Sequence, residues 1–384
     1  MRLEQRQNAG SLLKPQYEER SFLSLIRSLR SWCLQEQREA FVGDARHLVF
    51  LLIDGLGEVW LQRLGSDSFL AQNQVGSLSA VYPSTTTVAL ATLATAEPPS
   101  RHGMAGWWTY LSEQDLSTTP LPFTNRFGGG PLQLPGEAMW PLRPWMADSK
   151  VPSLVVTPRE YIDSVFTNYL SGGQERWGYA EPEECVQLVR AHQAVHESSF
   201  TYLYWPQFDS ACHSFGCDAA QTIAVFRRLD LLAKQLSKGL CQGSKLIVSA
   251  DHGLLDIEES AKYILREGEP ILECLLTPPS GEPRNPVFHV KDGCMERFRH
   301  LFEEQFFESF ELIESRKLQA LLGGELRPVA KSRFGDFVGA ALGPSVIHYR
   351  TGQDKRRPAF IGYHGGLTPE EMRIPLISIG PKAK

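Results

Sequence analysis

The chain has 384 residues, of which 42% are hydrophobic, so it is long enough to bury one large α/β core together with a smaller subdomain. A formal net charge of -5 and the lack of any Lys/Arg-rich block argue against a nucleic-acid-binding protein. The seven cysteines are scattered without paired C-x-x-C spacing, which argues against a disulfide framework and against a cysteine-type zinc site.

The N-terminal stretch has the pattern of a packed helix. Apolar side chains between residues 22 and 34 recur at near-helical spacing, which favours a helix on the main domain over a membrane-surface anchor. Residues 1–44 are therefore predicted to be a helical extension packed on the core. Residues 1–20 carry charges throughout, and the chain contains no apolar run of roughly 18 residues. We expect a cytoplasmic protein without a membrane partner.

The first strong strand signal is an apolar run from His47 to Ile53, which ends in Asp54 and Gly55 and is followed by a helical pattern. Such a run is typical of a strand that is buried on both faces of a parallel sheet. Open α/β sheets bind their ligands at the carboxyl ends of such strands. Asp54 is therefore a candidate functional residue, although Asp before Gly is also ordinary turn chemistry.

The next signal is a short strand over residues 76–83 that leads into the sequence PSTTTVALATLATA. This pattern predicts a helix whose first turn holds Thr85, Thr86 and Thr87. The N-terminus of a helix presents free N–H groups and a positive dipole to an anion. A threonine hydroxyl there is a candidate nucleophile, and a plain helix cap is the alternative.

Residues 96–150 are rich in Pro, Gly and Trp, and a long irregular stretch of this kind is typical of a functional loop. The side chains of Trp107, Trp108 and Tyr110 are candidates to wall a pocket for a ring-bearing group, with core packing as the alternative. Arg126 is a candidate contact for an anionic ligand. These four residues form the predicted substrate pocket.

Two further strands end in potential metal ligands. The secondary structure predicted here is, in order, a strand at 153–157, helices at 159–169 and 181–197, a strand at 200–205, a helix at 217–240 and a strand at 244–249. The strand at 200–205 leads to Asp209, and His213 follows four residues later, so that one helical turn places both side chains within reach of one ion. A surface hydrogen bond is the alternative. The last strand ends in Asp251 and His252, which repeats the pattern of Asp54.

The remaining chain predicts an insertion and a return to the sheet. Shorter alternating segments over residues 256–350 indicate a small α+β cap. His364 then precedes two glycines, a helix-opening Thr-Pro-Glu-Glu and a last strand. We predict an α/β fold with a central, mostly parallel, doubly wound sheet and helices on both faces. Residues 45–255 and 351–384 form this core, and 256–350 the cap.

The order and spacing of five segments resemble one family closely. The segments are LLIDGLG, YPSTTTVALATLATAEPPSRHG, YWPQFDSACHSFG, SADHG and HGGLTPEEMRIPLI. They resemble the alkaline phosphatase superfamily, above all its type I phosphodiesterase/nucleotide pyrophosphatase branch, over roughly residues 45–382.

The resemblance implies two divalent metal ions, usually zinc, with manganese or iron as alternatives. One ion is expected at Asp209, His213 and His364, and the other at Asp54, Asp251 and His252, with the Thr86 oxygen completing its shell. Thr86 is the implied nucleophile, and the implied reaction is a two-step phosphoryl transfer through a phospho-threonine. The expected substrate is a small phosphorylated molecule, for which a nucleotide-like compound is one candidate.

Two departures from the family pattern leave the substrate class open. Ala89 stands where phosphodiesterases of this branch usually have an Asn that binds a phosphoryl oxygen, and Cys212 stands where a Gly usually precedes the histidine ligand. A phosphomonoesterase and a phosphonoacetate hydrolase share the same ligand set and remain alternatives. The sulfatase frame C/S-x-P-x-R is missing. A non-catalytic, metal-stabilised interaction module is a further alternative, against which the complete set of ligands and nucleophile argues.

Overall fold

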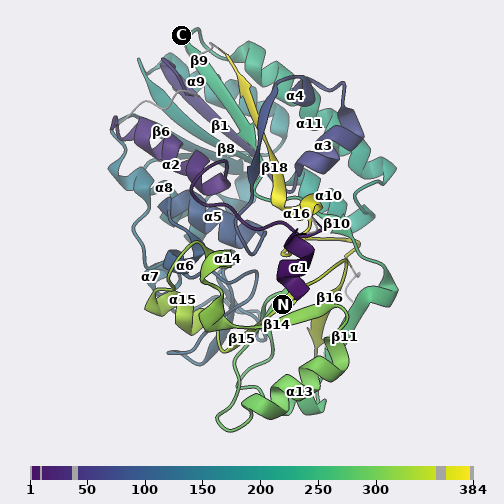
Figure 1. The fold of residues 1–384 in the computed structure, drawn as a ribbon. Helices are drawn as coiled ribbons and strands as arrows, with labels where there is room; N and C mark the ends of the chain where they lie inside the picture. The colour runs from purple at the N-terminus through teal and green to yellow at the C-terminus, as the bar shows by residue number, and fades with distance from the viewer. Residues whose placement is uncertain (1, 9–10, 37–41, 352–359, 381–384) are drawn as a thin grey trace.

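The computed structural model describes residues 2–8, 11–36, 42–351 and 360–380, and its main feature is a seven-stranded sheet in the order β2-β18-β9-β1-β8-β6-β7 (Figure 1). The strands are β1 (His47–Ile53), β2 (Gln74–Ser79), β6 (Ser153–Pro158), β7 (Glu175–Tyr179), β8 (Ser199–Trp205), β9 (Ser244–Ser249) and β18 (Arg373–Ile379). Strands β9, β1, β8, β6 and β7 are parallel, whereas β18 is antiparallel to both β2 and β9. The predicted mostly parallel sheet is confirmed.

Helices cover the sheet on both faces, and every residue of β1 is buried in consequence. One group of helices, α2, α5 and α8, packs together, and a second group comprises α3, α4, α9, α10 and α11 (Figure 1). The bounds are α2 (Phe22–Cys33), α3 (Glu58–Gly65), α4 (Phe69–Gln72), α5 (Thr86–Thr95), α6 (Pro99–His102), α7 (Gly136–Met139), α8 (Val165–Ser171), α9 (Cys185–Ala194), α10 (Gln207–Phe215), α11 (Ala220–Gly239) and α16 (Pro369–Met372).

Two predicted helices are shorter than the sequence pattern indicates. The predicted helix at 159–169 is a 3-10 turn, Arg159–Tyr161, followed by a separate α8, because the Ser164 hydroxyl caps α8 by accepting a hydrogen bond from the N–H of Thr167. The predicted helix at 181–197 begins with a 3-10 turn, Pro182–Glu184, and ends at Ala194. The local caps, which periodicity does not reveal, set these boundaries.

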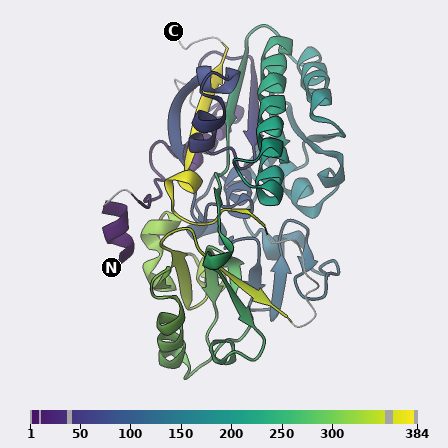
Figure 2. The same cartoon turned by 90° about the vertical axis from the view of Figure 1, so that its right-hand side faces the viewer.

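The proposed cap, residues 256–350, contains a second sheet in the order β12-β13-β15-β14 and a separate β11-β16 pair (Figure 2). Its elements are β10 (Leu255–Asp256), β11 (Lys262–Arg266), α12 (Pro270–Glu273), β12 (Ser280–Glu282), β13 (Asn285–Phe288), α13 (Met295–Phe306), β14 (Phe310–Glu314), α14 (Gln319–Leu322), α15 (Pro328–Arg333), β15 (Phe337–Ala341) and β16 (Val346–Arg350). It has its own phenylalanine-rich core, which includes Phe288, Phe298 and Phe302. In both views the cap lies below the central sheet.

Two other segments lie against the cap. A small sheet of β3 (Thr109–Leu111), β4 (Leu116–Thr119) and β5 (Thr124–Asn125) joins it through a bridge between Trp108 and Gly281. At the N-terminus, α1 (Arg2–Asn8) is attached to β14, where the N–H of Leu3 donates to Glu311, while the apolar face of α2 packs into the main core. We keep the division into extension, core and cap as a proposal; residues 1, 9–10, 37–41, 352–359 and 381–384 lie outside the described parts.

Within the described residues, no helix combines the length and the apolarity that crossing a bilayer requires.

A buried ion pair joins the cap to the core. Arg284 and Glu371 are both fully buried, and the guanidinium donates to the two carboxylate oxygens at 2.6 and 2.8 Å. Glu371 also accepts hydrogen bonds from the backbone N–H groups of Gly366 and Thr368. The pair therefore ties the turn between β12 and β13 of the cap to the loop that follows His364.

Replacing Arg284 by Met leaves the Glu371 carboxylate buried without its partner, so we expect the free energy of unfolding to fall by about 3–5 kcal/mol. Arg228, whose ion pairs with Glu181 and Glu183 are exposed, provides the control. Arg228→Ala should cost about 1 kcal/mol or less, because solvent screens such pairs. Urea unfolding measures both values, and equal losses would contradict the assignment of Arg284–Glu371 as the structural pair.

Candidate active site

Three adjacent strands of the central sheet deliver acidic and imidazole side chains to one edge. Strand β1 ends immediately before Asp54, and its neighbour β9 leads through Ala250 to Asp251 and His252. On the other side of β1, strand β8 leads into α10, which carries Asp209 and His213. Because these strands are parallel, their carboxyl ends lie side by side.

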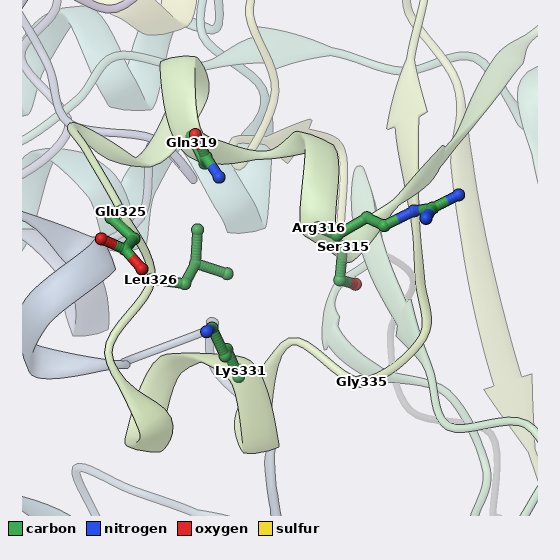
Figure 3. A pocket seen from close by; sticks show the side chains of 7 residues that line it. All are labelled: Ser315, Arg316, Gln319, Glu325, Leu326, Lys331 and Gly335. Atoms are coloured by element: carbon green, nitrogen blue, oxygen red, sulfur yellow. The ribbon is translucent and has the colours of Figure 1, made fainter.

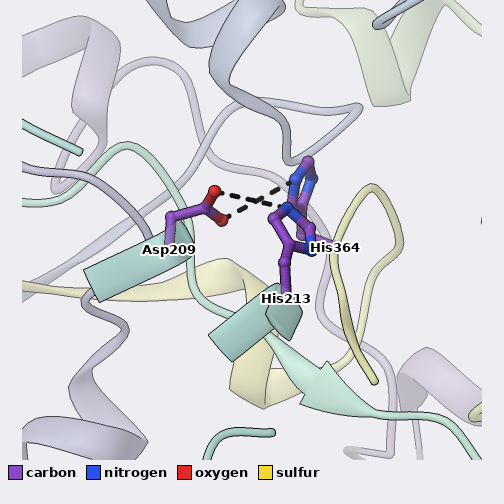
Figure 4. A group of neighbouring side chains, drawn as sticks. All are labelled: Asp209, His213 and His364. Carbon is purple, nitrogen blue, oxygen red and sulfur yellow. Dashed lines mark ion pairs between the residues drawn. The ribbon is translucent and has the colours of Figure 1, made fainter. Parts of the chain in front are cut away.

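The first group comprises Asp209, His213 and His364, whose potential ligand atoms all lie within 4.8 Å of one another (Figure 4). The Nε2 atom of His213 lies 3.2 Å from one Asp209 oxygen, one helical turn away, and the Nε2 of His364 lies 3.9 Å from the other. The Nδ1 atom of His213 lies 2.8 Å from the carbonyl oxygen of Gly362, a contact that orients the ring.

The second group comprises Asp54, Asp251 and His252, which are all buried and again have ligand atoms within 4.8 Å of one another. The Nε2 of His252 lies 3.5 Å from Asp54 and 3.4 Å from Asp251. Asp251 is held by the backbone N–H groups of Gly55 and His252, at 3.1 and 3.0 Å. The imidazole rings of His252 and His364 stack at 4.0 Å between centroids, so the two groups are neighbours.

The electrostatics of the site are those of crowded, buried carboxylates. Burial and the nearby charges of Asp251 and Asp209 raise the pKa of Asp54 well above its usual range. Burial would also raise the pKa of Asp209, but His213 and His364 lower it instead. Burial opposes the protonation of His213, yet Asp209 raises its pKa to about 9.

This donor set fits two divalent cations. Carboxylate and imidazole ligands together are typical of zinc, and three such donors converge at each position. One oxygen of Asp209 and one of Asp251 are buried without a hydrogen-bond partner. A bound cation would satisfy these two atoms and offset the repulsion between the three carboxylates.

Thr86 is the first residue of α5, with Thr85 at the N-cap. Its hydroxyl lies 3.1 Å from the Nε2 of His252 and 3.4 Å from an oxygen of Asp54. The side chain is 8% exposed, so the hydroxyl lies within the site and not on an open surface. Sequence reasoning predicted the neighbourhood of Thr86 and all six donors; their roles as nucleophile and metal ligands remain proposals.

The structure adds Tyr204, which sequence analysis missed. Its hydroxyl donates a hydrogen bond to Asp54 from the neighbouring strand β8. Burial and the negative charge of Asp54 raise the pKa of Tyr204 well above its usual value, so the hydroxyl is a donor. The only available signal was its place in the strand next to β1, which needs the strand order to interpret.

The structure also adds a tight hairpin of the cap, residues 282–285, between β12 and β13. A Glu282 oxygen accepts hydrogen bonds from the Thr85 hydroxyl at 2.7 Å and the Trp107 backbone N–H at 2.6 Å. Asn285 accepts from the hydroxyl of Tyr82. Burial raises the pKa of Glu282 to about 7, against the hydrogen bonds that lower it. No local pattern in the sequence links these residues to the turn of Thr85 and Thr86, which we name the nucleophile turn after the role proposed for Thr86.

The four predicted pocket residues have different surroundings. Trp107 is 39% exposed, and its backbone is tied to Glu282, next to Thr85. The guanidinium of Arg126 stacks 4.1 Å from the Trp108 ring centroid and donates to the Pro279 carbonyl. Tyr110 is buried, donates to Asp115 at 2.6 Å and packs on His289, as a core residue does. Contact of these four side chains with substrate remains a prediction.

Two other features lie outside the donor groups. Cys212 is fully buried, and its backbone packs against Gly362, where any side chain would meet the Cys212 carbonyl oxygen at 2.8 Å. A surface hollow of about 280 Å³ lies at α14 and α15, and none of the residues lining it belongs to the donor groups or the nucleophile turn (Figure 3). Its lining is Ser315, Arg316, Gln319, Glu325, Leu326, Lys331 and Gly335.

The doubly wound sheet, with its donors at the carboxyl edge of three central strands, places the protein in the alkaline phosphatase superfamily. Within that superfamily the chain belongs to the type I phosphodiesterase/nucleotide pyrophosphatase family, whose pattern it matches over residues 48–365. The family predicted from the sequence is confirmed, and the protein is a phosphoric ester hydrolase of a family that depends on divalent metal ions.

Solved structures share the fold at low sequence identity. Murine ectonucleotide pyrophosphatase/phosphodiesterase 5 superimposes with a TM-score of 0.66 at 16% identity, covering 87% of this chain and 88% of the other. The human protein of the same name gives 0.66 at 15% identity with the same coverage. An inactive threonine-to-alanine variant of the murine protein, in complex with AMP, gives 0.65 at 16% identity, again with the same coverage. No curated protein sequence matches the chain significantly.

Proposed function

We propose that the protein is a two-metal phosphodiesterase of the nucleotide pyrophosphatase type, with Thr86 as its nucleophile. The observation that carries this proposal is the position of the Thr86 hydroxyl, 3.1 Å from His252 and beside Asp54, at the N-terminus of a helix. The free N–H groups of that helix end favour an anionic phosphoryl group at the same place.

The proposed metal ligands are the two groups of donors. Asp54, Asp251 and His252 would hold one cation beside Thr86, and Asp209, His213 and His364 would hold the other. Two divalent cations supply charge stabilisation at the transferring phosphoryl group and lower the pKa of the attacking oxygen. Zinc suits the ligands best, and manganese or iron are alternatives.

Thr86 performs the first chemical step. Its oxygen gives up its proton to solvent and forms a bond to phosphorus, while the bond from phosphorus to the leaving oxygen breaks and that oxygen takes up a proton from solvent. The result is a phospho-threonine whose phosphorus keeps the second ester group of the substrate. Water then attacks phosphorus and loses a proton, the bond to the Thr86 oxygen breaks, and that oxygen regains a proton, which releases the phosphorylated product. Thr85 holds the turn through its hydrogen bond to Glu282.

The proposed substrate is a small phosphorylated molecule with a nucleotide-like group. The complex of the murine relative with AMP supports this proposal, as do the partly exposed Trp107 and Trp108 near the nucleophile turn. Arg126, stacked on Trp108, is the proposed cationic contact. Tyr110 packs within the small sheet, and in this proposal it forms a wall of the pocket only through that packing.

The test is a comparison of three chromogenic esters with the metal-loaded protein. We expect bis-p-nitrophenyl phosphate and a nucleoside p-nitrophenyl ester to be hydrolysed with a higher kcat/KM than p-nitrophenyl phosphate. Hydrolysis of none of the three by protein with full metal content would overturn the proposed function.

A phosphomonoesterase is the second candidate because of Ala89. This residue is fully buried in α5 and offers no polar group to a phosphoryl oxygen, where the usual phosphodiesterase has an Asn. A preference for p-nitrophenyl phosphate over both diesters would favour this candidate and leave the proposed metal ligands intact.

The hydrogen bond from Tyr204 to Asp54 should strengthen metal binding at the proposed site of Asp54. Tyr204→Phe removes this outer partner of a proposed ligand, and we expect metal affinity there to fall about 10- to 100-fold. Tyr169→Phe, the same chemical change at a hydroxyl that donates to the Leu142 carbonyl, is the matched control and should leave affinity unchanged. Competitive titration with a chelating dye measures both affinities, and equal values for the two variants would contradict the role given to Tyr204.

A further inference from the structure

The cap hairpin places a fourth carboxylate beside the nucleophile. Glu282 is 3% exposed and contacts the nucleophile turn through Thr85 and the Trp107 segment through its backbone N–H. Its side chain also packs against the loop of His364, because a side chain at Gly365 would meet the Glu282 Cβ at 2.9 Å. Glu282 therefore lies where three segments of the site meet.

Glu282 has no basic ion-pair partner in the part of the chain that the structure describes. No Lys, Arg or His there forms an ion pair with it, and its charge is close enough to act on both His213 and Asp209. Three Asp carboxylates with two divalent cations would leave the site at about +1, and ionised Glu282 would bring it to about zero. A neutral site discriminates more strongly against a doubly charged phosphoryl group than a positive one does.

We propose that Glu282 is a specificity-determining residue that disfavours dianionic phosphomonoesters, so that the site accepts monoanionic phosphodiesters even though Ala89 replaces the usual Asn. This inference rests on the proposed function. It assigns the choice between diester and monoester to a charge supplied by the cap, and not to a polar group on α5.

The substitution Glu282→Gln separates charge from position. The Gln side-chain oxygen retains the acceptor for the Thr85 hydroxyl and the Trp107 N–H, and the size of the side chain is unchanged. Glu282→Leu is a second charge-free variant of similar volume, in case one of the two fails to fold. Glu311→Gln is the matched control, because Glu311 is a buried acid of the same cap that accepts from the N–H of Leu3, at the N-terminus.

Two measurements on metal-loaded protein test the proposal. Both are made at pH 8.5, where Glu282 carries its negative charge and inorganic phosphate is mainly the dianion. The first is the ratio of kcat/KM for bis-p-nitrophenyl phosphate to that for p-nitrophenyl phosphate, which we expect to fall about tenfold in Glu282→Gln. The second is calorimetric binding of inorganic phosphate, which we expect to tighten about tenfold. Glu311→Gln should change neither value.

The outcomes distinguish this inference from the proposed function. If the wild-type protein binds metal but hydrolyses no ester, the proposed function fails, and tighter phosphate binding by Glu282→Gln still supports the role of its charge. If the ester ratio and phosphate binding both change less than about threefold in the charge-free variants, the inference is overturned, however far the two rates fall together.

Discussion

Replacing Thr86 by Ala is expected to lower kcat/KM for the preferred diester by at least about 10³-fold while both metal ions stay bound. Among the described residues of α5, only the Thr86 hydroxyl contacts both His252, at 3.1 Å, and Asp54. The substitution therefore removes the proposed nucleophile and leaves the six donors in place. Steady-state kinetics gives kcat/KM for the variant and the wild type, and elemental analysis gives the metal content of both.

Thr87→Ala is the matched control for this variant. Thr87 is the next residue of the same helix, and its buried hydroxyl has no hydrogen-bond partner, so its loss should change activity little.

Acid-quenched wild-type protein should in addition carry one phosphoryl group on the peptide that contains Thr86. If Thr86→Ala keeps activity within about tenfold of wild type, the covalent mechanism is wrong.

Removal of the metal ions is expected to have an effect of the same size. Asp209→Asn and Asp54→Asn each remove one proposed charged ligand, and each should lower the bound metal from about two ions per chain to about one and kcat/KM by about 10³-fold. The physical reason is that a neutral amide oxygen neither attracts a divalent cation as a carboxylate does nor offsets its charge. Elemental analysis after dialysis counts the ions directly.

Asp230→Asn is the control for these variants, because Asp230 is an acidic acceptor on α11 whose partners are the backbone N–H groups of Phe69 and Leu70. Its metal content should equal that of wild type. Chelation should abolish activity in the wild-type protein, and added zinc should restore it. Full activity after complete chelation would rule out the two-metal proposal.

Much of the site could be predicted because its signals are local. The apolar run before Asp54, the i,i+4 spacing of Asp209 and His213 and the Asp251-His252 pair after β9 each lie within a few residues of the element that positions them. Hydrophobic periodicity reports buried strands and helices directly, and parallel strands bring such ends to one edge. The helix boundaries near Ser164 and Pro182 were less accurate, because caps and 3-10 turns set them.

Contacts between residues far apart in the chain could not be predicted. Glu282 and Thr85 are 197 positions apart, and Tyr204 and Asp54 are 150 apart, so nothing in their local sequence marks them as neighbours. The surroundings of the predicted pocket residues could not be read from the sequence for the same reason. The backbone N–H of Trp107 donates to Glu282, which also accepts from Thr85, whereas Tyr110 is part of a small buried sheet.

The class of fold, the family and the donor-bearing strand ends follow from the amino-acid sequence alone, since these depend on patterns that span a few residues and recur in a set order. The side chains that surround those donors are known only from the folded chain: Tyr204 on Asp54, Glu282 on the nucleophile turn, and Arg284 with Glu371 at the loop that follows His364. Those contacts depend on the order of the strands and on how a separate, cap-borne hairpin packs against the sheet edge, and the free energy of that packing is a property of the whole fold.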